Sequence, residues 1–148
     1  MSIFDSLDPE KQQEIYRESL KVGDVFLKEF EEAEHKKLFI IAGISDDRIF
    51  ICSVFINSEI HKSIANKPNI SKLQIPLLKS RNAFLKYDSF VNCSYPIHIN
   101  SKSITNGIVE NTCKFIGSIH QQDLKFVQNT LIESRLLSDE EIELYFSK

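Results

Sequence analysis

The sequence contains no tryptophan, one methionine, and only four glycines and four prolines among its 148 residues. So few glycines cannot form a Gly-rich phosphate-binding loop, and the abundance of Ile and Phe argues against disorder. The longest apolar run covers residues 38–44, far less than the ~20 residues of a membrane span. The first residues include no apolar signal region. We therefore expect neither a membrane segment nor secretion.

Cysteine is also scarce, with three widely spaced residues at positions 52, 93 and 113. An odd number without a CxxC pair fits reduced thiols in the cytoplasm better than a disulfide framework. The four histidines match no metal-ligand spacing, so we predict no metal and no other cofactor. A site made of Cys93, His98, Cys113 and His120 would require the fold to gather them. Cysteines in apolar strands act more often as small core residues.

Carboxylates are nearly absent from the middle third of the chain. Residues 61–109 contain seven Lys and Arg against one Asp, a net charge of +6, although the whole chain has a net charge of −3. Such a segment can present a positive face to phosphates. The basic residues predicted to contact substrate are Lys62, Lys67, Lys72, Lys79, Arg81 and Lys86. The other interpretation is that they are solvated loop residues scattered over the surface.

The length favours one domain over residues 1–148. Within it we expect a helical extension at 1–22, a core at 23–134 and a C-terminal helix at 135–148. Asp8 and Pro9 begin a first helix that ends near Leu20. Apolar periodicity predicts a second helix from about 121 to 134. Ser138 and Glu141 form a capping box for a short final helix.

The region between these helices is typical of short β-strands. Residues 37–43 and 48–56 are continuous apolar runs joined by a turn, which predicts a hairpin of two strands buried on both faces. One further strand is predicted to begin at Asp24. The others cover residues 72–75, 90–93, 95–104 and 112–116. No βαβ alternation occurs, so the pattern predicts a mostly antiparallel α+β fold, a small barrel with added helices.

Candidate catalytic groups flank the two buried strands. His35, Lys36 and Lys37 directly precede the first strand. An imidazole titrates near neutral pH and can transfer protons, and lysines can stabilise charge that develops on a phosphate. The other interpretation is that this cluster offsets the acidic run at 29–34. Asn57 and Ser58 end the second strand and either terminate it or supply amide and hydroxyl donors to a ligand.

The order of these pieces resembles the MazF/PemK-like family of small bacterial ribonuclease toxins, from about Val22 to Leu131. The similar segments are Gly23-Asp24-Val25-Phe26, Leu38-Phe39-Ile40-Ile41, the strand 51–58 that ends in Asn-Ser, the Leu-Lys-Tyr-Asp-Ser-Phe-Val stretch at 85–91, and Ile116-Gly117-Ser118-Ile119 before a helix. The resemblance implies an SH3-like barrel and a homodimer. It also implies metal-independent cleavage of single-stranded RNA, in which the RNA 2′-OH attacks the phosphate and leaves a cyclic phosphate.

The resemblance also implies roles for the candidate residues. The family's Arg-Pro pair is absent, and His35-Lys36-Lys37 takes its place. His35 would then act as acid or base, Lys36 or Lys37 as the electrostatic stabiliser, and Ser58, with Asn57 beside it, as a hydrogen-bond donor to the phosphate. A toxin would in addition bind an antitoxin protein, through an acidic segment of that partner.

The missing arginine leaves a second function open, a catalytically inactive module of the same fold that binds RNA or a protein. RNA binding by such a module would be sensitive to salt, because lysines release counterions from phosphates. A third interpretation is a structural or regulatory partner protein, which would need an apolar surface patch that sequence does not reveal.

Overall fold

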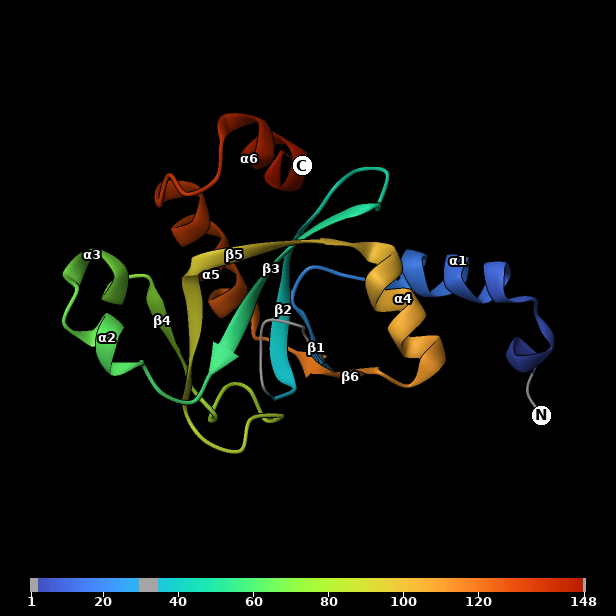
Figure 1. Cartoon of the computed structure of the whole chain (residues 1–148), viewed down its shortest axis with the longest axis horizontal. Helices are drawn as coiled ribbons and strands as arrows, with labels where there is room; N and C mark the ends of the chain where they lie inside the picture. Colours follow the sequence, from blue (N-terminus) through green and yellow to red (C-terminus); the bar gives the residue numbers. More distant parts are fainter. Residues whose placement is uncertain (1–2, 30–34, 148) are drawn as a thin grey trace.

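The chain forms one six-stranded sheet with helices around it, as the computed structural model shows for residues 3–29 and 35–147 (Figure 1). All described strand pairs are antiparallel, and the strand order is β4-β5-β3-β2-β1-β6. The strands are β1 (Asp24–Lys28), β2 (Lys37–Ile44), β3 (Phe50–Asn57), β4 (Gln74–Leu77), β5 (Ser89–Asn100) and β6 (Cys113–Ser118). The predicted antiparallel α+β class is confirmed.

The sheet is open, which corrects the predicted SH3-like barrel. β4 and β6 lie at its two edges, and no ladder among the described residues joins them. β4 is four residues long and includes Pro76, which has no N–H group to donate to a further strand. The strand predicted at residues 72–75 is therefore displaced, since β4 begins at Gln74 and continues past Pro76 to Leu77.

Helices flank the sheet at several places. They are a 3₁₀ turn (Phe4–Ser6), α1 (Pro9–Ser19), α2 (Lys62–Ala65), α3 (Pro68–Ser71), α4 (Ser101–Glu110), α5 (Gln121–Glu133) and α6 (Asp139–Phe146). The predicted caps are confirmed, because Asp8 accepts from the Lys11 amide and Ser138 forms the capping box with Glu141. In the described part of the chain, no helix has the length and apolarity needed to cross a membrane.

Helix α4 replaces the end of a predicted strand. The alternation at 95–104 is real only as far as Asn100, and β5 is one strand of 12 residues rather than two short ones. Asn100 then caps α4 by accepting from the Lys102 amide (2.9 Å), and Asn111 ends the helix with φ +63°. Ile104 lies on the buried face of α4. Period-2 alternation over a few residues did not distinguish a strand end from a helix start.

Two apolar clusters pack on the opposite faces of the sheet. Alternate residues of β2 belong to each, with Ile40 and Ala42 in the cluster covered by α5 and α6, and Phe39 and Ile41 in the cluster with α4. The prediction that β2 is buried on both faces is therefore confirmed. The three cysteines are free and buried, as expected for core residues, and burial raises the pKa of Cys52 and of Cys93 to about 12.

Helix α6 approaches the backbone of β2 very closely at Gly43. A Cβ atom at this position would lie 2.7 Å from Cβ of Tyr145 and 2.9 Å from a ring carbon of Phe146. Tyr145 is buried, and its hydroxyl lies 3.0 Å from Nδ1 of His98 on β5. Burial raises the pKa of Tyr145 to about 12, so the hydroxyl stays protonated. The small residue at 43 is what allows the helix to dock.

We predict that Gly43→Ala lowers the free energy of unfolding by about 1–3 kcal/mol, because the added methyl group overpacks the contact with α6. The measurement is equilibrium urea denaturation. Gly117→Ala serves as the comparison, since its nearest neighbour would be the half-buried Phe84 side chain at 3.1 Å, which can shift. Equal losses for the two variants would show that the α6 contact is not tight.

Candidate active site

A cavity of about 920 Å³ opens where β2 begins and β3 ends. Its wall is completed by α2 and by the loop between β4 and β5. The cavity brings together six of the residues predicted from sequence, and these are His35, Lys36, Lys37, Asn57, Ser58 and Lys86. Three groups of predicted residues thus meet at one place. They are the cluster before β2, the residues at the end of β3 and one lysine of the basic segment.

Antiparallel pairing explains why the first two groups meet. Leu38 on β2 pairs with Ile56 on β3, so the residues just before β2 lie beside the residues just after Ile56. In a pair of neighbouring antiparallel strands, the start of one strand lies beside the end of the other. The hairpin predicted from the apolar runs already implied that these two groups of residues lie side by side. Residues 30–34, where the acidic run was expected to offset the cluster, lie outside the described residues.

The ammonium group of Lys37 is held in place by two neighbours. Its Nζ donates to Oδ1 of Asn57 (2.6 Å) and lies 5.6 Å from the ring centroid of Phe55. Both contacts come from β3, and the Lys37 side chain is half-buried. Phe55 packs with the apolar cluster that contains Phe39, whereas Leu38 and Ile56 of the cavity wall belong to the cluster on the other face, so this ammonium lies at the edge of the cavity. His35, Lys36 and Ser58 are exposed at the same opening.

One part of the cavity wall is apolar. It is formed by side chains of β1, β2, β3, α2, β6 and the loop after β4, namely Leu27, Leu38, Ile56, Ile64, Phe84, Leu85 and Ile116. The cavity therefore combines polar side chains with an apolar surface that suits a ring or another apolar group. Sequence patterns did not predict this wall, because its residues come from six separate elements.

Five further polar residues of the cavity were not predicted as site residues, and these are Glu59, His61, Gln74, Tyr87 and Ser89. His61 precedes α2, which is only four residues long and was not predicted as a helix. Tyr87 lies within the stretch that resembles the toxin family, but its ring stands 57% exposed at the cavity. A histidine in a carboxylate-poor segment was the only available signal for His61.

Most of the predicted phosphate-tracking residues lie outside this cavity. Lys62, Lys67 and Lys72 are exposed on the α2–α3 segment, whose His61 and Ile64 line the wall. Lys79 and Arg81 are exposed in the loop after β4. Of the basic residues predicted to contact substrate, only Lys86 lines the cavity.

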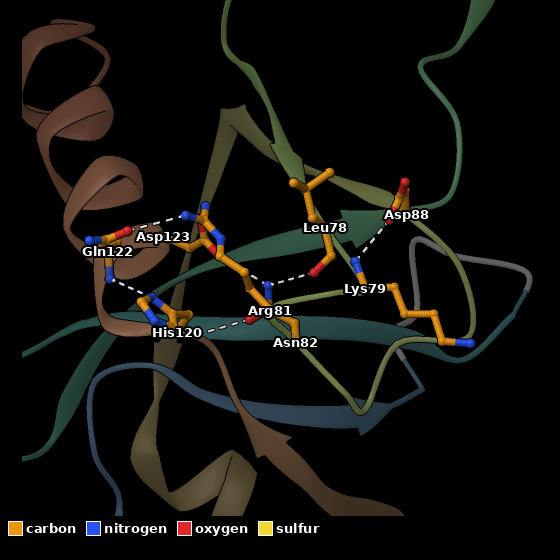
Figure 2. Close-up of polar contacts among 8 residues, drawn as sticks. All are labelled: Leu78, Lys79, Arg81, Asn82, Asp88, His120, Gln122 and Asp123. Atoms are coloured by element: carbon orange, nitrogen blue, oxygen red, sulfur yellow. Dashed lines mark hydrogen bonds and ion pairs between the residues drawn. The ribbon is translucent and has the colours of Figure 1, made fainter.

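Arg81 serves the fold of the cavity loop. Its guanidinium forms an ion pair with Asp123 on α5 and donates to Gln122 (3.2 Å), as Figure 2 shows. The Asp123 side chain is only 6% exposed and also accepts from Nδ2 of Asn82 (3.0 Å). A buried carboxylate requires such partners, so Arg81 anchors the loop to the start of α5.

Asn82 is the centre of this anchor and is 1% exposed. Its Nδ2 donates to the Leu78 carbonyl (2.9 Å) and to Asp123, while its Oδ1 accepts from the His120 amide (2.9 Å) (Figure 2). Nearby, the Lys79 amide donates to Asp88 (2.9 Å), which closes the loop on itself. These bonds fix the segment that contributes Phe84, Leu85, Lys86 and Tyr87 to the cavity.

The histidines and cysteines considered for a metal site are used in other ways. In residues 3–29 and 35–147, no three His, Cys, Asp or Glu side chains are grouped as a metal site requires. Cys93 and Cys113 are buried in the sheet. His98 lies 3.1 Å from Glu141 through Nε2, and His120 caps α5.

Comparison with known proteins assigns no family to this chain. No family model matches the sequence, and no curated protein matches it either. The resemblance to the MazF/PemK-like family therefore rests on the motifs quoted above. The chemistry of the cavity is the remaining guide to function.

We predict that Asn82→Ala destabilises the protein by about 1–3 kcal/mol for each buried polar partner that it leaves unpaired. The same change also releases the loop after β4, so the amide hydrogens of residues 78–88 exchange faster. Both effects are measured by urea denaturation and hydrogen–deuterium exchange. Asn129→Ala is the matched control, because Asn129 is an exposed asparagine on α5. A loss of stability without faster exchange in the loop would contradict the anchoring role.

Proposed function

We propose that this protein is a metal-independent endoribonuclease that cleaves single-stranded RNA. The observation that carries the proposal is the joint position of His35, Lys36, Lys37, Asn57 and Ser58 around one cavity. A proton-transfer group, fixed cations and hydrogen-bond donors are the parts that phosphodiester cleavage by the RNA's own 2′-OH requires.

In this reaction the 2′-oxygen forms a bond to phosphorus while the bond from phosphorus to the 5′-oxygen breaks. The proton of the 2′-OH must leave, and the departing 5′-oxygen must gain one. His35 serves one of these transfers as base or acid, and water supplies the other. Lys37, held against Asn57 and Phe55, stabilises the negative charge that grows on the phosphate oxygens. Lys36 adds charge, and the Ser58 hydroxyl donates to a phosphate oxygen.

The shape and charge of the cavity favour a nucleotide over a simple anion. The apolar wall with Phe84 and Tyr87 offers surfaces on which an unstacked base can lie. The exposed lysines of the basic segment, Lys62, Lys67, Lys72, Lys79 and Lys86, are the groups that would contact the RNA backbone beyond the cavity. Such a layout suits a flexible single strand, whose bases can turn toward the protein.

The order of the motifs supports placing this chain with the MazF/PemK-like toxins. On that assignment the protein is a cytoplasmic homodimer that an antitoxin binds through an acidic segment. The free, buried cysteines are compatible with a reducing compartment. The open sheet departs from the barrel of that family, so the assignment rests on motif order and the cavity rather than on barrel closure.

One observation favours the second function, an inactive module that binds RNA or a protein. No arginine is among the described residues that line the cavity, and the ammonium of Lys37 is already bonded to Asn57. This arrangement can bind phosphate without accelerating cleavage. Salt-sensitive RNA binding with no product would then be the outcome.

The test is cleavage of a long unstructured RNA by purified protein in the presence of a chelator. We expect discrete products with 2′,3′-cyclic phosphate ends, and a rate about 10²–10⁴-fold lower for His35→Asn, because general acid–base catalysis contributes that much. His120→Asn is the control, since His120 lies outside the cavity lining and asparagine also caps helices. Cleavage by His35→Asn at the wild-type rate would contradict the assignment, and intact RNA with wild-type protein would favour the binding module.

A further inference from the structure

His61 brings a second imidazole to the cavity that contains His35. It is the N-cap residue of α2, and its Nδ1 accepts a hydrogen bond from the Ser63 amide (3.1 Å). The Ser63 hydroxyl lies 2.7 Å from the same nitrogen. Both described contacts of the ring are thus made by Nδ1, within a single helical turn.

These contacts fix the tautomer of the ring. A backbone N–H can only donate, so Nδ1 must accept and cannot carry a proton while this bond exists. In the neutral ring the proton is then on Nε2, which becomes a hydrogen-bond donor. A second proton would have to go to Nδ1, where it would face the Ser63 N–H and break the cap. While this cap is formed, the ring therefore presents a donor, Nε2–H, on its other side.

We propose that His61 binds a phosphate oxygen of the RNA through Nε2–H and takes no part in proton transfer. This inference rests on the proposed function, since it names how the same cavity holds its substrate. Lys36, Lys37 and Lys86 line the cavity with His61 against one carboxylate, Glu59, so the lining carries a net positive charge that favours an anionic oxygen as the acceptor. His35, whose described contacts include no such cap, keeps the proton-transfer role. The two histidines of the cavity thus divide binding and chemistry between them.

The chain contains a matched twin of His61. His120 caps α5 with nearly the same backbone angles (φ −59°, ψ 142°, against −59° and 141° for His61). Its Nδ1 accepts from the Gln122 amide at the same distance, 3.1 Å. His120 does not line the cavity. His61 and His120 therefore share their local structure and differ in their access to the substrate.

The test compares His61→Asn with His120→Asn, because asparagine preserves an N-cap but is too short to place a donor where Nε2 lies. The probe is a fluorescent single-stranded 2′-O-methyl RNA, which lacks the nucleophile and so cannot be cleaved. We expect His61→Asn to weaken binding about tenfold or more, as the loss of a hydrogen bond to a charged group implies. His120→Asn should bind as the wild type does, and circular dichroism should be the same for both.

A second readout separates binding from proton transfer. Nitrogen-15 NMR of the ring should show the neutral Nε2–H tautomer for His61 at pH 7. If the wild type cleaves RNA, His61→Asn should raise KM with little change in the pH profile of kcat, whereas His35→Asn should change that profile.

Several outcomes would overturn the inference. Equal binding by His61→Asn and His120→Asn would do so, as would an Nδ1–H tautomer at His61, or a wild-type protein that does not bind the probe. Binding that depends on His61 without any cleavage would instead refute the ribonuclease and leave the inference standing. Cleavage of RNA by the wild type, together with equal binding by His61→Asn and His120→Asn, would refute this inference and leave the ribonuclease standing.

Discussion

The pairing of β2 with β3 is the constraint on which the rest of this structure depends. Both strands are apolar on both faces, so each needs cover on two sides, and the helices and remaining strands provide it. The same pairing places the cluster at 35–37 beside Asn57 and Ser58. Lys37 then bonds to Asn57 across the two strands, so the contact that stabilises the strand ends also orients the cation of the site. The register of β2 against β3 therefore determines both the centre of the fold and the position of the candidate catalytic groups.

Polar anchors shape the rest of the cavity from a distance. The loop after β4 has no regular structure, yet Asn82 and Asp123 bury its turn against α5 with a full set of hydrogen bonds. In α2, His61 satisfies a free amide of a four-residue helix and in doing so acquires a defined tautomer. Both cases show a residue used for local folding that also determines what a ligand meets. Binding groups held in this way lose little entropy when a ligand arrives.

Sequence patterns predicted the elements wherever caps or long apolar runs were present. The helix from Asp8, the Ser138 capping box and the hairpin of β2 and β3 were all visible, because each rests on contacts between residues close in the chain. Prediction failed at α4, α2 and α3, where short alternating or polar stretches have no unique period. The prediction of a closed barrel was wrong for a different reason. Closure depends on whether the two edge strands of the sheet, which are far apart in the chain, pair with each other.

The sequence by itself therefore determined the antiparallel α+β class, the central hairpin and, through it, the meeting of His35, Lys36 and Lys37 with Asn57 and Ser58. Tertiary structure alone decided that the sheet stays open and that Lys86, His61 and Tyr87 join the cavity. It also decided that Arg81 bonds to a buried aspartate instead of lying at the opening. The physical reason is the range of the interactions. Caps and hairpins are set by neighbours, whereas edge pairing, buried ion pairs and cavity walls depend on residues that only the folded chain brings within contact.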